Sequence, residues 1–369
     1  MSAPIRILHV LGGLNRGGAE TLVMNIYRKI DKNQFQFDFV VHNTTHDVYE
    51  DEILQMGGRI FRCPKYSGFN HNVYKKWWNK FFCEHEEYKI IHGHVRSTAS
   101  IYLKIARKFG RFAIAHSHST KAGKGFAGFV KSIFQSRIRY NADFFMGCSK
   151  EANRWLFGKK VANDQKRCLI LKNGIDVEKF KFNTVVRERV RNELGIKDDL
   201  VIGTVGRIDT PKNPLFLVDI FYELHLKNKK IKLLWVGDGP LKKNVVEYAK
   251  DKGIIKDILF VGSVPNVYDY LDAMDAFVFP SLWEGLGMSL IEAQANGITC
   301  FISSAIPQEA ILCKNVYVIE NLESPQAWAD AITNNSLQRN VENNLVIKKS
   351  GFDIDGVVKV LTDVYNRAM

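Results

Sequence analysis

Short apolar runs alternate with longer amphipathic stretches along almost the whole chain, and this rhythm most restricts how the chain can fold. The runs are rich in Val, Ile and Phe, and they occupy residues 5–11, 37–41, 89–94, 112–117, 143–149 and 168–173, then 200–207, 231–237, 257–263, 275–281, 299–304 and 316–320. Strand–helix alternation of this kind predicts an α/β protein whose parallel sheets are covered by helices.

The length of 369 residues exceeds what one ordinary core holds and suits two such domains. Polar turn residues interrupt the rhythm at 172–183, before a new helical pattern begins. We therefore expect one doubly wound domain over residues 1–175 and a second over 183–350. Because ligands of open parallel sheets bind beyond the carboxyl ends of the strands, we expect a site in a cleft between the two domains.

Charge is distributed unevenly between the two halves. Residues 1–180 contain 30 Lys and Arg against 15 Asp and Glu, and the remainder contains 22 against 24. The basic half predicts an anionic partner: a nucleic acid, a membrane surface or a phosphate-bearing substrate. The six cysteines form no Cys-x-x-Cys pair, which favours free thiols in a reducing compartment over a zinc site. No apolar run approaches the length of a membrane span, and the N-terminus is interpreted as a first strand and not as a signal peptide.

A glycine-rich loop, "GGLNRGGAE" at Gly12 to Glu20, follows the first expected strand and opens a helix. Glycines at a helix N-terminus let backbone amides approach an anion. The spacing is neither G-x-G-x-x-G nor a phosphate-loop motif, and the second strand does not end in an acid. NAD binding is therefore disfavoured.

Two basic residues follow the first strand of the second half, in "GRIDTPKN". Arg207 and Lys212 lie in one turn and could both reach a diphosphate, Arg by bidentate contact and Lys as a point charge. Taken by itself, Lys212 is interpreted as a solvated loop lysine, whereas Arg207 directly after a strand end is the better candidate.

Two glutamates flank a glycine turn in "PSLWEGLGMSLIEAQANG". Glu284 precedes the turn, and Glu292 lies in a short helix whose flanking residues are apolar. A buried carboxylate without a partner is costly, so Glu292 is expected to accept hydrogen bonds from a diol such as ribose. The amides near Gly285 to Met288 would stand at the positive end of that helix.

Four histidines end two neighbouring strands, as "HGH" (His92, His94) and "HSH" (His116, His118). Alternation places each pair on one face of the sheet, as a metal site requires. The absence of carboxylates from 88 to 142 and the many lysines there disfavour a metal. Hydrogen bonds to a sugar or phosphate, or plain packing, are preferred.

Basic and aromatic residues interleave in "STKAGKGFAGFVKSIFQSRIRY", residues 119–140. This pattern suits an anionic membrane surface, although single-stranded nucleic acid would also accept it.

Four of these motifs, in this order, resemble glycosyltransferase family 4. "EGLGMSLIE" resembles its Glu-x7-Glu signature, "GRIDTPK" its diphosphate-binding pair and "NGIDVEKF" its interdomain segment, and the opening "HVLGGLNRGGAETLVMNIYRKID" is similar to bacterial capsular and exopolysaccharide enzymes. The resemblance implies a GT-B fold of two Rossmann-like domains and metal-independent, retaining transfer from a nucleotide-sugar. It also implies that a helix at about 352–369 packs back on the first domain.

The resemblance further implies roles for particular residues. Glu292 would hold the ribose and Glu284 the donor sugar, while Arg207 and Lys212 would neutralise the diphosphate. His118 would face the sugar, with His116 as the alternative. The remaining donor contacts would be Gly17, Gly18, Val264, Pro265, Gly285, Leu286, Gly287 and Met288. The segment "SSAIPQEA" departs from the family pattern, which leaves Glu309 without an assigned role.

The sequence thus predicts an enzyme that moves a sugar, with UDP as the expected nucleotide, onto a lipid-linked saccharide in bacterial capsule, exopolysaccharide or O-antigen synthesis. No cofactor or metal is expected. The expected location is the cytoplasm, with the basic half on the inner face of the membrane. Two alternatives are a nucleotide-sugar epimerase of the same fold and a nucleic-acid-binding protein without activity.

Overall fold

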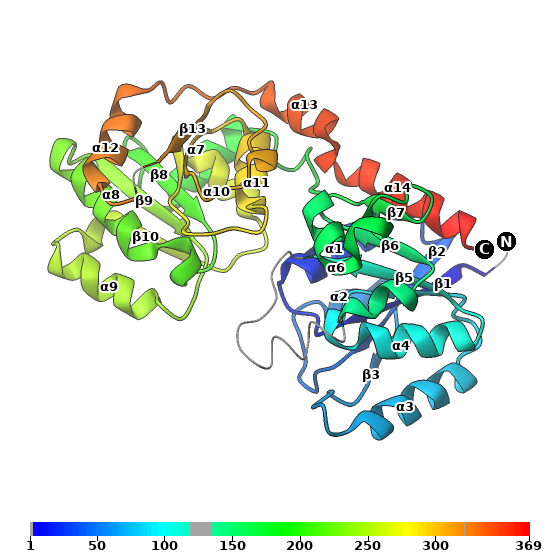
Figure 1. Ribbon diagram of the computed structural model, residues 1–369. Helices are drawn as coiled ribbons and strands as arrows, with labels where there is room; N and C mark the ends of the chain where they lie inside the picture. The colour runs from blue at the N-terminus through cyan, green and yellow to red at the C-terminus, as the bar shows by residue number, and fades with distance from the viewer. Residues whose placement is uncertain (1–2, 119–134, 321) are drawn as a thin grey trace. The chain divides into compact units, whose positions relative to one another are not determined.

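The computed structural model describes residues 3–118, 135–320 and 322–369. Its internal contacts divide the chain into two compact units (Figure 1). Unit 1 comprises Met1–Ile175 and Ile354–Met369, and unit 2 comprises Asp176–Asp353. The basic stretch at 119–140 lies mostly outside the described residues, so its expected role as a membrane-binding surface stays a prediction.

Unit 1 is built on a parallel sheet of seven described strands in the order β3-β2-β1-β4-β5-β6-β7. The strands are β1 (Ile5–Leu11), β2 (Phe35–Val41), β3 (Ile60–Arg62), β4 (Ile90–Gly93), β5 (Phe112–Ser117), β6 (Phe144–Gly147) and β7 (Cys168–Ile170). The described helices are α1 (Gly18–Lys29), α2 (Glu50–Gln55), α3 (His71–Glu84), α4 (Arg96–Lys108), η1 (Ile138–Tyr140), α6 (Lys150–Ala162) and α14 (Ile354–Arg367).

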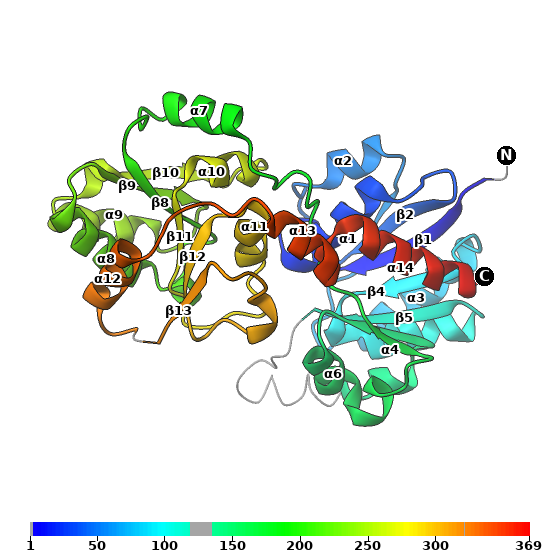
Figure 2. The same ribbon diagram turned by 90° about the horizontal axis from the view of Figure 1, so that it is seen from above.

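Side-chain alternation along β1 feeds two cores on the two faces of this sheet. Ile7 packs in one core with α1 and α14, whereas Leu8 packs in the other with α3 and α4. The C-terminal helix α14 lies against α1 (Figure 2), and the amide of Ile354 donates to the carbonyl of Ile175 at 2.8 Å. The end of the chain is therefore part of the first unit.

Unit 2 repeats the arrangement with six described strands in the order β10-β9-β8-β11-β12-β13. These are β8 (Leu200–Val205), β9 (Ile231–Val236), β10 (Ile258–Gly262), β11 (Ala276–Phe279), β12 (Thr299–Ser303) and β13 (Val316–Ile319). The accompanying helices are α7 (Thr184–Glu193), η2 (Thr210–Lys212), α8 (Pro214–Lys227), α9 (Lys242–Asp251), η3 (Ile255–Asp257), α10 (Val267–Ala273), α11 (Met288–Asn296), η4 (Gln308–Ala310), α12 (Pro325–Asn334), α13 (Asn343–Ile347) and η5 (Lys348–Phe352).

Both sheets have the strand order of doubly wound nucleotide-binding folds, as the sequence predicts. The order reverses between β1 and β4 in unit 1 and between β8 and β11 in unit 2. Loops beyond these pairs diverge, so each pair marks where a ligand can enter. In the part of the chain that the structure describes, no helix is both long and apolar enough to cross a membrane.

Candidate functional site

The two motif loops of unit 2 meet at its switch point. The loop with Arg207 and Lys212 follows β8, and the loop with Glu284 follows β11, the neighbouring strand. The amide of Leu282 donates to the carbonyl of Pro211 at 2.8 Å, which joins the two loops. The sheet topology therefore brings together motifs that stand far apart in the sequence.

Lys212 makes the central contact of this site. Its Nζ donates to Glu284 Oε1 at 2.5 Å and lies 4.4 Å from the centre of the Phe279 ring. The Ser281 hydroxyl donates to the same carboxylate oxygen at 2.9 Å. The side chains of Lys212 and Glu284 are only 21% and 11% exposed, so the interpretation of Lys212 as a solvated loop lysine is wrong.

Glycines allow the backbone around this pair to come close. Gly287, the N-cap of α11, has φ 81° and ψ 58°, a left-handed conformation that glycine adopts without strain. A Cβ on Gly237 at the end of β9 would lie 2.0 Å from the carbonyl oxygen of Gly206. Gly285 and Leu286 belong to the turn before this N-cap, and Met288 is the first residue of α11. The N-cap of α11 thus stands only three positions after Glu284 in the sequence.

Glu292 lies one turn into α11 and is partly buried between fully buried neighbours, Ile291 and Ala293. Burial raises the pKa of its carboxyl group to about 7, and the charge of Lys212 acts in the opposite direction. A carboxylate so placed gains from a ligand that donates hydrogen bonds to it. Lys212 therefore influences both glutamates of the motif.

Arg207 has a different environment on the same loop. Its side chain is 71% exposed, and its Nε lies 3.8 Å from Asp209 Oδ2. An exposed guanidinium keeps its donors available for an anionic ligand. The expected base-reading residues, Val264 and Pro265, lie in the loop between β10 and α10, and Glu309 lies exposed in the short helix η4.

In unit 1 the glycine-rich loop joins β1 to α1. Gly17 is the N-cap of α1 and Gly18 its first residue. Asp47 holds the loop in place, because it accepts from the amide of Leu14 at 2.6 Å and from the side-chain amide of Asn15 at 2.5 Å. The amides that open α1 are thus positioned by a contact from outside the motif.

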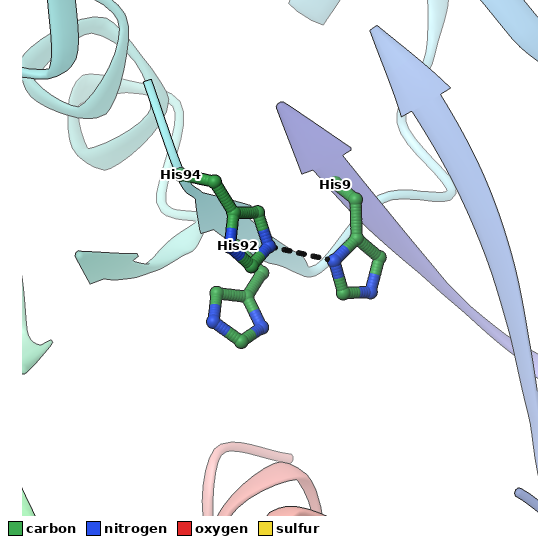
Figure 3. Close-up of side chains that lie close together, drawn as sticks. All are labelled: His9, His92 and His94. Carbon is green, nitrogen blue, oxygen red and sulfur yellow. Dashed lines mark hydrogen bonds between the residues drawn. The ribbon is translucent and has the colours of Figure 1, made fainter. Parts of the chain in front are cut away.

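Five histidines gather at the switch point of unit 1. His9 on β1 is paired in register with His92 on β4. His9 Nδ1 lies 3.0 Å from His94 Nε2 (Figure 3), and His94 Nδ1 lies 2.8 Å from His118 Nε2. His92 Nε2 lies 3.2 Å from His116 Nδ1, and its Nδ1 lies 2.8 Å from the hydroxyl of Tyr365 on α14. His118 is the member of the cluster that retains partial exposure, whereas His116 is buried.

Burial lowers the pKa of all five rings, to about 3 for His9 and His118. The imidazoles are therefore neutral at physiological pH. Neither His9 nor Tyr365 is among the site residues that the sequence predicts. The sequence signal for His9 is its position as a polar residue inside an apolar strand. Because His9 and His92 are paired in register, their side chains point to the same face of the sheet.

Two pockets differ in whether residues of the sequence motifs line them. One of about 470 Å³ lies at the carboxyl ends of β1 and β2 in unit 1 and is lined by Gly12, His42, Asn43, Thr44, Thr45, Lys65, Tyr66, Val95, Ser97 and Thr98. Another, of about 780 Å³, lies by the start of β8 in unit 2. Its charged residues Arg187 and Arg191 pair with Asp275, so it is a structural ion-pair region away from the motifs.

Comparison with known proteins covers both units. Residues 16–179 match the model for "Glycosyltransferase Family 4", and residues 186–349 match that for "Glycosyl transferases group 1". A putative glycosyltransferase of Bacillus subtilis strain 168, EpsF, is 33% identical over 374 residues, which cover 99% of this chain and 97% of that protein. The capsular polysaccharide biosynthesis glycosyltransferase CapH of Staphylococcus aureus is 24% identical and covers 98% of each chain.

A third relative carries a more explicit name. The UDP-Gal:alpha-D-GlcNAc-diphosphoundecaprenol alpha-1,3-galactosyltransferase of Escherichia coli is 26% identical over 300 residues, 76% of each chain. Among solved structures, Anabaena HepE in complex with UDP superposes with a TM-score of 0.80 at 14% identity, covering 98% of this chain and 100% of that one. The fold is thus GT-B, and the chain belongs to glycosyltransferase family 4.

Proposed function

We propose that this glycosyltransferase moves a sugar from a UDP-sugar to a polyprenyl-diphosphate-linked saccharide in bacterial surface polysaccharide synthesis, with retention of anomeric configuration. The names of the E. coli and S. aureus relatives support the acceptor class and the pathway. The structure of HepE with UDP supports the nucleotide.

The observation that carries the proposal is the arrangement of Lys212, Glu284 and Glu292 around the start of α11. In this assignment Glu292 accepts from the ribose diol, and Glu284 accepts from a hydroxyl of the donor sugar. Lys212 has three donors, so it can hold Glu284 and still reach a phosphate oxygen. Arg207 supplies the second cation, and the amides from Gly285 to Met288 contribute further donors.

Departure of the nucleoside diphosphate builds negative charge on oxygen, and these groups stabilise that charge. One such donor contributes about 2.7–4 kcal/mol to barrier lowering. We assign same-face attack, in which the leaving phosphate takes the proton of the acceptor hydroxyl. Lys212 and Arg207 perform the charge neutralisation that Mg²⁺ performs in other phosphate sites. In unit 1, His118, Gly17 and Gly18 are the proposed ligand contacts, and the hydroxyls and amides of the 470 Å³ pocket suit a saccharide.

The test incubates the purified chain with a panel of UDP-sugars and a short-chain polyprenyl-diphosphate saccharide. A new glycosidic bond with the donor's anomeric configuration, detected by NMR, is expected. Turnover should change less than about twofold when Mg²⁺ or Mn²⁺ is added or withheld. An inverted product would overturn the retaining assignment, and conversion of the donor without acceptor would instead identify an epimerase.

A further inference from the structure

The histidine cluster of unit 1 has a feature that sugar binding does not require: its rings are arranged in two tiers. His94, His116 and His118 form the outer tier, and one ring nitrogen of each lies within 4.8 Å of those of the others. His9 and His92 form the inner tier, and each contacts one nitrogen of an outer ring, on His94 and His116 respectively.

The contacts with His9 and His92 decide which nitrogen of His94 and of His116 is left to bind a ligand. His94 uses Nε2 toward His9, so its Nδ1 is left, and this atom lies 2.8 Å from His118 Nε2. His116 uses Nδ1 toward His92, so its Nε2 is left. That atom is buried and has no hydrogen-bond partner within the described part of the chain. A buried polar atom without a partner calls for an occupant.

Neutral imidazoles arranged in this way are ligands for a transition metal. Ligand histidines of zinc sites commonly donate their second ring N–H to a neighbouring acceptor, which fixes the tautomer. Here His9 and His92 serve as those acceptors, and the His92 ring is held in turn by the Tyr365 hydroxyl. The 2.8 Å contact between His94 Nδ1 and His118 Nε2 holds one proton between two neutral rings, and binding of the ion moves that proton from the ligand atoms to His118 Nδ1.

We propose that unit 1 binds one zinc-type divalent ion through His94 Nδ1, His116 Nε2 and His118 Nε2. Two nitrogens at 2.0–2.1 Å from a tetrahedral ion stand about 3.3 Å apart, so the His94–His118 pair opens by about half an ångström on binding. Nitrogen ligands without a carboxylate select Zn²⁺, Co²⁺ or Ni²⁺ over Mg²⁺ or Ca²⁺.

Three protein ligands leave a fourth position for water or an anion. The positive charge of Arg96 acts on His118, and it favours an anionic fourth ligand over a neutral one. All three proposed ligands belong to unit 1, and His118 bound through Nε2 keeps Nδ1 for its proposed contact with the donor sugar. The inference therefore shares His118 with the proposed function, and metal titration tests it without requiring transfer activity.

A second group of three histidines, His9, His92 and His94, also meets the distance requirement. In that group both nitrogens of His92 already have partners, Tyr365 and His116. The outer tier is favoured because the partner of His94 Nδ1 is another member of the group, His118, and His116 Nε2 has no partner among the described residues.

The experiment uses the full chain after removal of bound metal by chelation. Titration with Zn²⁺ against a chromophoric chelator is expected to show one equivalent bound, and Co²⁺ is expected to give the visible absorption of a four-coordinate nitrogen–oxygen site. Zinc-edge absorption should place imidazole nitrogens at about 2.0–2.1 Å. A thiolate-to-Co²⁺ charge-transfer band would overturn the assignment by pointing to the free cysteines.

Variants locate the site. His116→Ala should weaken Zn²⁺ binding at least about a hundredfold. His9→Gln changes only the inner-tier partner of His94 and should weaken binding about tenfold. His46→Ala, at a 63% exposed side chain of the same unit, is the matched control and should bind as the parent does. Circular dichroism of the metal-free variants verifies folding. Parent-like affinity in a folded His116→Ala variant, or a larger loss in His9→Gln, would overturn the proposal.

Discussion

The two units share one sheet topology, but the side chains at their switch points differ in charge. Unit 1 gathers neutral histidines whose pKa values burial lowers, and unit 2 gathers a lysine and two glutamates, one with a raised pKa. The strand order positions the site in each case, whereas the side chains decide what the site can hold. The difference indicates that the fold supplies a location and leaves the electrostatics to a few residues.

Loss of the Lys212 charge should have the largest effect. Lys212→Met keeps the aliphatic stem over Phe279 but leaves Glu284 without its cation, and kcat should fall about a thousandfold. The pKa of Glu292 should rise further, because Lys212 now lowers it. Steady-state kinetics at saturating donor measures the effect. Lys242→Met is the control, since Lys242 also pairs with a carboxylate, that of Asp238, and its Nζ lies 5.9 Å from the centre of the Phe260 ring.

Arg207 tests whether an exposed cation contributes as much as a buried one. Arg207→Ala should lower kcat at least about a hundredfold without a change in melting temperature, because its side chain is 71% exposed. Arg189→Ala, also an exposed arginine of unit 2, should retain activity. Near-normal turnover of Arg207→Ala at saturating donor would remove Arg207 from the mechanism.

Glu292 should control donor affinity through its ionisation. The carboxylate accepts from the ribose diol, so the donor KM of the parent should fall about tenfold as pH rises from 6 to 8 across the pKa of about 7. Glu292→Gln should raise KM about tenfold at pH 8 and flatten this dependence, while Glu247→Gln on α9 should change neither. A parent KM that does not vary with pH would contradict the assignment.

Stability should depend on pH in opposite directions in the two units. The folded-state pKa values of the histidines lie below the unfolded value of 6.5, so the unfolded chain binds more protons and stability falls as pH drops below 6.5. Each ring contributes a slope of up to about 1.4 kcal/mol per pH unit. Glu292, with a folded pKa of about 7 against 4.5, instead loses stability as pH rises from 4.5 to 7.

Melting temperatures of the metal-free chain between pH 5 and 8 measure both effects. His116→Gln should be less stable than the parent at pH 8, by about 1–2 kcal/mol, and the deficit should shrink at pH 5. The melting temperature of Glu292→Gln relative to that of the parent should rise by about 2–6 °C between pH 5 and pH 8. A constant difference for either variant would show that the group titrates alike in both states.

The strands were predictable because their apolar runs are strong and regularly spaced. The run at 112–117 coincides with β5, and that at 5–11 coincides with β1. The strand β3 was missed, since three residues at Ile60–Arg62 produce too short a pattern against the turn that precedes them. The break at 172–183 contains the division at Ile175, and the expected second unit began later than the observed one.

The motifs of the candidate site could be recognised in the sequence, but the contacts between them could not. Glu292 could be singled out because its flanking residues are apolar, and a carboxylate there needs a partner. Lys212 could not be read correctly alone, since its partner Glu284 lies 72 residues away and only the adjacency of β8 and β11 brings them together. His9 and Tyr365 were missed for the same reason, because their contacts depend on strand register and on the return of α14.

By itself the sequence determined the α/β class, the family and the residue types available at each strand end. These depend on local periodicity and short motifs, which a linear chain carries in full. Only the tertiary structure decided which charges pair and which histidines meet. Pairing requires neighbours in the sheet, and burial, which shifts the pKa values of Glu292 and the five histidines, is a property of the packed chain.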